Sequence, residues 1–183
     1  MASLDNAERK LYADRYCEYR TRQVWHSEHE REFFIAFCVI NGYHHFQVRP
    51  LIGMEMPMTL VREPENVYDS NAIKVVIPSI HELNHELLDI VVRERTGETV
   101  RRIAGRTVGR VPKVIAGILS PAIDSGKIRQ ATAFYTGGML HGDHPTLGKG
   151  PKLECMYCFE TDSCDTVTNV ISEIGRVTQV TTL

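Results

Sequence analysis

Six short runs of β-forming residues are the feature that most limits how this chain can fold. Turn-forming residues such as glycine, proline and asparagine separate these runs, and the strands do not alternate regularly with helices, as a parallel sheet would require. We therefore predict an α+β protein, mainly β: a small closed or nearly closed β-barrel with helices at its ends. The predicted strands cover residues 32–40, 54–62, 72–77, 108–111, 127–135 and 153–159.

Three helical patterns flank or interrupt these strands. One covers residues 4–24, a second begins after Pro112, is interrupted at Pro121 and ends at Gly126, and the third carries an apolar stripe (Val167, Val170, Ile171, Ile174). Residues 80–95 fit either a helix or a strand. We expect 43–49 to continue the first strand, 137–150 to form a long mobile loop, and the last eight residues to fray or to add an edge strand. The predicted divisions are an N-terminal helical extension (1–31), a barrel (32–160) and a C-terminal helix and tail (161–183).

Composition narrows the class of protein. The chain has 183 residues, enough for one domain, and its net charge of −2 argues against a polycation that wraps duplex DNA. No apolar run approaches the roughly 18–20 residues that cross a bilayer, and no apolar stretch follows the first charges, so we expect an intracellular protein. The 5 cysteines are an odd number, which argues against a disulfide framework.

The segment LVREPENVYDSNAIKV, residues 60–75, reads as a strand, a polar turn and a second strand. Asn66 and Asp69 can hydrogen-bond their own backbone and so hold the turn. Tyr68 would then stand at a rigid corner, where its ring can stack on a base while the neighbouring polar groups reach a sugar or a base edge. In the alternative interpretation the turn is purely structural and Tyr68 folds onto the core.

This segment and a second one, TVGRVPKVIAGILSPAIDSGKI, resemble the HIRAN domain, which occurs in DNA-repair proteins and as a stand-alone module. The matched residues are an arginine–acidic–proline run with Asn66, Tyr68, Asp69 and Asn71, followed by Gly109, Pro112-Lys113 and Asp124-x-Gly126. The resemblance covers roughly residues 33–160. It implies a modified OB-like barrel that binds single-stranded DNA, in some members at a free 3′ end, and a nuclear protein.

The resemblance also implies roles for particular residues. The turn tyrosine and aspartate contact the terminal nucleotide, and they match Tyr68 and Asp69. A lysine that approaches a phosphate matches Lys113. An Arg–Tyr pair after the first strand is replaced here by His44-His45, and arginine is the better phosphate ligand of the two residue types. The predicted nucleic-acid site consists of Tyr68, Asp69, Asn66, His44, His45, Phe46, Arg110 and Lys113.

An insertion over residues 78–107 departs from compact members and runs into a basic stretch. Seven cations stand there against Glu94 and Glu98, so the stretch is either a groove that follows a phosphate backbone or a solvated surface. The cations are Arg93, Arg95, Arg101, Arg102, Arg106, Arg110 and Lys113.

A zinc site is the third candidate. His141-x-x-His144 and Cys155-x-x-Cys158 are two ligand pairs, and Cys164 could replace one ligand. Residues three apart in a regular strand point to opposite faces, however, so Cys155 and Cys158 could chelate together only at a turn. The alternative is two small strand cysteines and two solvent-facing histidines, with no cofactor.

The sequence contains no phosphate-binding glycine loop, no G-x-S-x-G and no H-E-x-x-H motif. We therefore predict a binding module and not an enzyme. The predicted partner is single-stranded nucleic acid. The rival prediction is a protein-interaction or scaffold module that keeps the barrel while its pocket has drifted. In that case the terminal helices would hold a protein partner or a second copy of the chain, and no membrane is involved.

Overall fold

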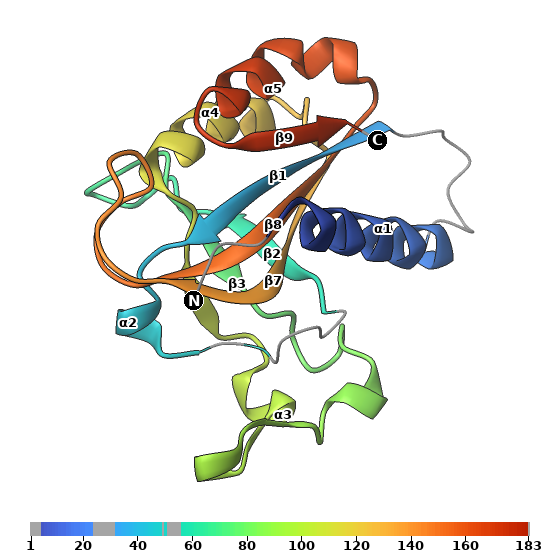
Figure 1. Cartoon of the computed structure of the whole chain (residues 1–183), viewed down its shortest axis with the longest axis vertical. Helices are drawn as coiled ribbons and strands as arrows, with labels where there is room; N and C mark the ends of the chain where they lie inside the picture. Colours follow the sequence, from blue (N-terminus) through green and yellow to red (C-terminus); the bar gives the residue numbers. More distant parts are fainter. Residues whose placement is uncertain (1–4, 24–31, 49, 51–55, 183) are drawn as a thin grey trace.

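The computed structural model describes residues 5–23, 32–48, 50 and 56–182, and its main element is a seven-stranded antiparallel sheet (Figure 1). The strand order is β6-β3-β2-β7-β8-β1-β9, and a separate hairpin pairs β4 (Val91–Arg93) with β5 (Glu98–Thr99). The seven strands are β1 (Glu32–Ile40), β2 (Met58–Arg62), β3 (Ile73–Val76), β6 (Thr107–Arg110), β7 (Gln130–Leu140), β8 (Lys152–Thr161) and β9 (Gln179–Thr182).

Helices cover both faces of the sheet. α4 and α5 lie together on one side in Figure 1, and their apolar residues join the main core cluster around Phe34, Tyr157 and Phe159. On the other face Ala13 of α1 packs against a smaller cluster that contains Ile35. None of the helices in the described part of the chain is long and apolar enough to cross a membrane. The helices are α1 (Asn6–Gln23), α2 (Tyr43–Phe46), α3 (Val100–Ile103), α4 (Lys113–Asp124) and α5 (Thr168–Gly175).

One bridge joins two strands that stand five places apart in the sheet order. Asn41, directly after β1, exchanges two backbone hydrogen bonds with Arg110 at the end of β6, each 2.8 Å long. The sheet therefore curls until its first strand reaches its sixth. The prediction of an α+β, mainly β protein is confirmed, while the closed or nearly closed barrel stays a prediction.

The expected strand continuation over 43–49 is wrong. Gly42 has φ 78° and Gln47 has φ 54°, and these two left-handed residues bound a single helical turn, α2, in place of a strand. The chain leaves the sheet at Gly42, whose lack of a Cβ makes that conformation inexpensive. The second strand was predicted from residue 54, but β2 begins at Met58, and residues 51–55 lie outside the described part. The helix after Pro112 was predicted to be interrupted at Pro121, but α4 runs through Pro121 to Asp124.

The glycine-rich segment 137–150 was expected to be loop throughout, but its first part is strand. β7 continues to Leu140 because Met139 pairs with Leu153 across a register shift that absorbs the two glycines. The rest is held by hydrogen bonds: the Lys152 Nζ donates to the carbonyl oxygens of Gly142 and Gly150 at 2.7 and 2.6 Å. The last eight residues were expected either to fray or to add an edge strand, and residues 179–182 form the edge strand β9.

The insertion forms a lobe that projects from the lower end of the sheet in Figure 1. Over 80–95 no continuous helix forms, and the strand alternative holds only for β4; the insertion consists of two short 3-10 turns, the β4–β5 hairpin and α3. Its apolar side chains reach the main core, which holds the lobe against the sheet. These buried residues are Leu83, Leu88, Val100 and Ile103.

Candidate nucleic-acid interface

The turn between β2 and β3 presents an aromatic ring to solvent. Tyr68 is 92% exposed, and its backbone N–H donates to the Asn66 Oδ1 at 3.0 Å. Asp69 repeats this arrangement, since its Oδ1 accepts from the Asn71 N–H at 3.0 Å. Both side chains thus hold the turn as predicted, and Tyr68 is not folded onto the core. The structure favours the open corner over the buried one.

Arg62 fastens this turn to α4. Its Nε and Nη2 donate to the two carboxylate oxygens of Asp124 at 3.0 and 2.8 Å, and its Nη1 donates to the backbone oxygens of Ser70 and Ala72. The Arg62 hydrogen bond lowers the pKa of Asp124, which keeps the carboxylate ionised. The arginine of the first motif and the aspartate of the second are therefore partners that make the corner rigid.

A second arginine connects the turn to α2. The Arg110 Nε and Nη2 donate to the Glu63 carboxylate at 2.7 and 3.2 Å. The guanidinium carbon of Arg110 also lies 5.7 Å from the centre of the Phe46 ring, within reach of a cation–π interaction. Glu63 is continuous with the turn, because its carbonyl oxygen accepts from the Asn66 N–H at 2.9 Å. A chain of contacts thus runs from Phe46 to the base of the Tyr68 corner.

The two histidines of α2 stand near each other and not against the tyrosine. Their ring centroids are 3.9 Å apart, and both side chains are exposed. Within the ranges that the structure describes, no hydrogen bond, ion pair or ring contact joins His44 or His45 to Tyr68. Of the predicted opposite wall, only Phe46 is connected to the turn, through Arg110 and Glu63.

Lys113 is the first residue of α4, three residues after Arg110, the last residue of β6. Its side chain is exposed, and in the described part of the chain it makes no hydrogen bond or ion pair. Its ammonium group is therefore free for an anionic ligand, whereas Arg110 already uses two of its N–H groups on Glu63.

Four of the seven cations in the basic stretch form ion pairs, two of them with acids outside the stretch, Asp89 and Glu63. Arg101 lies 3.1 Å from Asp89, Arg106 lies 3.2 Å from Glu98, and Arg110 lies 2.7 Å from Glu63. Arg93 also approaches Glu98. The cations that lack an ion pair among the described residues are Arg95, Arg102 and Lys113. The stretch is not one continuous basic groove.

Acid is expected to loosen the link between Glu63 and Arg110. The hydrogen bond from Arg110 lowers the pKa of Glu63, so this contact stabilises the folded state above the ordinary carboxylate pKa, and the stabilisation is lost as pH falls through the lowered value. We expect the difference in unfolding free energy between wild type and Glu63→Gln to be largest at neutral pH and to shrink in acid. Urea denaturation at a series of pH values measures it.

The exposed Glu65, in the same turn, supplies the control. Glu65→Gln removes one negative charge without touching Arg110. If its stability difference narrowed as much as that of Glu63→Gln, net charge would explain the effect and the contact would not.

The four zinc candidates do not converge. Cys155 belongs to the main core cluster and Cys158 to the cluster on the other face of the sheet, as the strand geometry predicts. His144 uses its Nδ1 to accept hydrogen bonds from the backbone of Thr146 and Leu147. Among the described residues no three His, Cys, Asp or Glu side chains could hold one ion.

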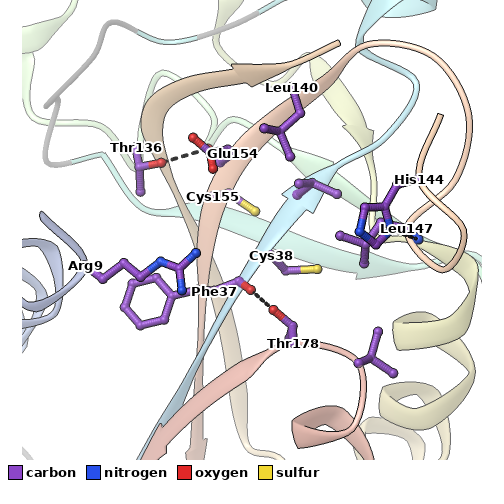
Figure 2. A pocket seen from close by; sticks show the side chains of 12 residues that line it. Arg9, Phe37, Cys38, Thr136, Leu140, His144, Leu147, Glu154, Cys155 and Thr178 are labelled. Atoms are coloured by element: carbon purple, nitrogen blue, oxygen red, sulfur yellow. Dashed lines mark hydrogen bonds between the residues drawn. The ribbon is translucent and has the colours of Figure 1, made fainter. Parts of the chain in front are cut away.

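Figure 2 shows His144 and Cys155 on the wall of a pocket of about 330 Å³ beside the edge of β1. Burial raises the pKa of the Cys38 thiol in this pocket to about 12 and that of Cys155 well above its ordinary value. Zinc binds thiolates, so these protonated thiols are poor ligands. The pocket offers a metal no set of ligands.

Sequence reasoning missed Arg62, Glu63 and Asp124 as organisers of the site. All three lie inside the matched motifs, and opposite charges in two motifs were the available signal. The sequence shows no pairing, however, because Arg62 and Asp124 are 62 residues apart and Glu63 and Arg110 are 47 apart.

The fold and the site define a binding module: a curled antiparallel sheet with an exposed ring on the β2–β3 turn and, among the described residues, an unpaired lysine at the start of α4. The family model of the HIRAN domain matches residues 34–137, more than half of the chain. The chain belongs to the HIRAN domain family, which is a family of nucleic-acid-binding modules.

The crystal structure of the HIRAN domain of human HLTF is similar, with 19% sequence identity and a TM-score of 0.43, over 79% of this chain and 87% of that one. A comparison with curated proteins gave no match.

Proposed function

We propose that this domain binds single-stranded DNA, without catalysis, and prefers a free 3′ end. In this proposal the terminal base stacks on Tyr68, Lys113 and Arg110 hold phosphate, and Asp69 accepts a hydrogen bond from the terminal sugar. The observation that carries it is the 92% exposed Tyr68 ring on a corner that its own hydrogen bonds hold rigid. A preformed corner binds at little cost in conformational entropy.

The free oxygen of Asp69 supports the preference for a 3′ hydroxyl. Oδ1 is used on the Asn71 N–H, while Oδ2 accepts no hydrogen bond from the residues that the structure describes and so remains an acceptor on the residue that follows Tyr68. A sugar hydroxyl can donate to a carboxylate, whereas a terminal phosphate would be repelled by it. A hydrogen bond to a charged group contributes about 1.5–3 kcal/mol, enough for tenfold discrimination.

The remaining site residues have narrower roles in this proposal. Asn66 holds the turn, while Phe46 and Arg110 form the adjacent wall, with the other N–H groups of Arg110 open to phosphate. His44 and His45 contact the bound DNA further from its 3′ end. We take the sheet to be an OB-like barrel closed at the Asn41–Arg110 bridge. A nuclear location and a role in DNA repair remain predictions that depend on this proposal.

Two oligonucleotides that differ only at the 3′ end test the proposal. We expect a 3′-phosphorylated strand to bind about tenfold more weakly than the 3′-hydroxyl strand, as measured by fluorescence anisotropy at low salt. Asp69→Asn keeps the oxygen that holds the turn, so it should remove this discrimination without unfolding the corner. Equal affinity of wild type for both strands would refute 3′-end recognition, and no binding to either would refute the proposed function.

The rival scaffold prediction lacks the exposed stripe that would have favoured it. Val167 and Ile174 are buried, and Val170 and Ile171 pack against the main core. The apolar side of α5 therefore covers the sheet and is not free for a partner.

A further inference from the structure

A second recess lies between α2, the 3-10 turn η2 (Glu94–Thr96) of the insertion and the segment that joins β7 to β8. Its volume is about 600 Å³. His44, Arg93, Arg95 and His141 line it together with Tyr43, and none of the described residues on its wall is acidic. In a chain whose net charge is −2, a cleft lined by cations and imidazoles and free of carboxylates is suited to an anion.

The two arginines of this cleft are held differently. The Arg93 Nη2 donates to the carbonyl oxygen of Gln47 at 2.6 Å, and its Nε lies 3.9 Å from Glu98. Arg93 therefore attaches the insertion to the end of α2. Arg95 is exposed and makes no ion pair in the part of the chain that the structure describes. It leaves a full guanidinium charge in the cleft.

α2 connects this cleft to the Tyr68 corner. Phe46 lies beneath Arg110 on the side of the turn, while Tyr43 and His44 of the same helical turn line the cleft. A single strand of DNA whose 3′ end lies at Tyr68 and which passes over α2 would therefore reach Arg95 next. Guanidinium groups form paired hydrogen bonds with phosphate oxygens, and imidazoles donate single ones.

We propose that this cleft binds the sugar–phosphate backbone of nucleotides that lie 5′ of the one at Tyr68, with Arg95 as the main phosphate ligand. The inference rests on the proposed function and assigns the insertion a role: its η2 turn lengthens the binding surface beyond the terminal nucleotide. Contact with phosphates makes this part of the interaction independent of base sequence.

Oligonucleotide length separates the cleft from the corner. Wild type should bind an eight-nucleotide 3′-hydroxyl strand more tightly than a dinucleotide in anisotropy titrations over several salt concentrations. Arg95→Ala should weaken the longer strand roughly threefold and make its salt dependence shallower by about one phosphate contact, while dinucleotide binding is unchanged. The control is Arg102→Ala, which removes an exposed, unpaired arginine of the same insertion outside the cleft.

Equal losses in Arg95→Ala and Arg102→Ala would show a diffuse effect of charge and overturn the proposal. If no oligonucleotide binds wild type, the proposed function fails and the cleft is judged with tripolyphosphate alone, followed by amide NMR shifts. Shifts at Thr96 and His141 that vanish in Arg95→Ala would keep the cleft as a polyanion site. Their absence in wild type would remove it as well.

Discussion

Tyr68→Ala is expected to weaken binding of single-stranded DNA by about tenfold to a hundredfold, because base–aromatic stacking contributes roughly 1–3 kcal/mol per base. The ring is 92% exposed and has no core contact to lose, so the midpoint of thermal unfolding should stay where it is. Anisotropy titration with a short 3′-hydroxyl oligonucleotide measures the first effect and calorimetry the second. Loss of affinity without loss of stability would place Tyr68 at the interface.

Val67 provides a matched control, since it precedes the tyrosine and is 89% exposed. Val67→Ala removes exposed apolar surface from the same turn but no ring. We expect its affinity to stay within about twofold of wild type, because no stacking is lost. If both variants weakened binding equally, the stacking role of Tyr68 would be wrong. If Tyr68→Ala bound as tightly as wild type, the site would lie elsewhere.

Gly109→Ala should strongly destabilise the sheet. A Cβ at this buried position of β6 would lie 2.3 Å from the carbonyl oxygen of Asn41 and 2.5 Å from the Ile40 Cγ2. Strands β1 and β6 would have to separate, which breaks the two hydrogen bonds between Asn41 and Arg110. We expect a loss of about 2–4 kcal/mol in unfolding free energy from overpacking and the lost bonds, measured by urea denaturation.

The same substitution should also weaken DNA binding, because Arg110 would move away from Phe46 and Glu63. Gly117→Ala is the control: Gly117 is exposed in α4, and its added Cβ would meet no heavy atom within 4 Å. Alanine is the better helix former, so this variant should gain roughly 0.5–1 kcal/mol. A Gly109→Ala protein as stable as wild type would show that the β1–β6 approach is not close in solution.

Local preference explains the elements that were predicted well. The run from Phe33 to Ile40 is apolar and rich in β-formers, and β1 covers the predicted residues. The corner around Tyr68 was predictable for the same reason, because Asn66 and Asp69 hold it through partners two residues away. Both partners of such a hydrogen bond lie within one short window of the sequence, so the window alone reveals them.

Distant partners explain two of the failures, and local backbone conformation explains a third. The strand expected after Asn41 became α2 once two left-handed residues turned the chain off the sheet, and the glycine segment became strand because Leu153 pairs with Met139. The basic stretch appeared to carry a large excess of positive charge because Asp89 and Glu63, which neutralise two of its arginines, lie outside it. For the glycine segment and the basic stretch the deciding partner lies outside the window that was read, whereas α2 follows from the left-handed backbone at Gly42 and Gln47.

The sequence by itself determined that this is a mainly β chain with a rigid Tyr68 corner, since propensity and hydrogen bonds within a few residues suffice for that. Only the tertiary structure decided what surrounds the corner: Arg62 on Asp124, Arg110 between Glu63 and Phe46, and an insertion arginine opposite α2. Side chains such as these meet only after the sheet has formed and brought residues distant in the sequence together. The free energy of those contacts depends on the whole fold and not on neighbouring residues.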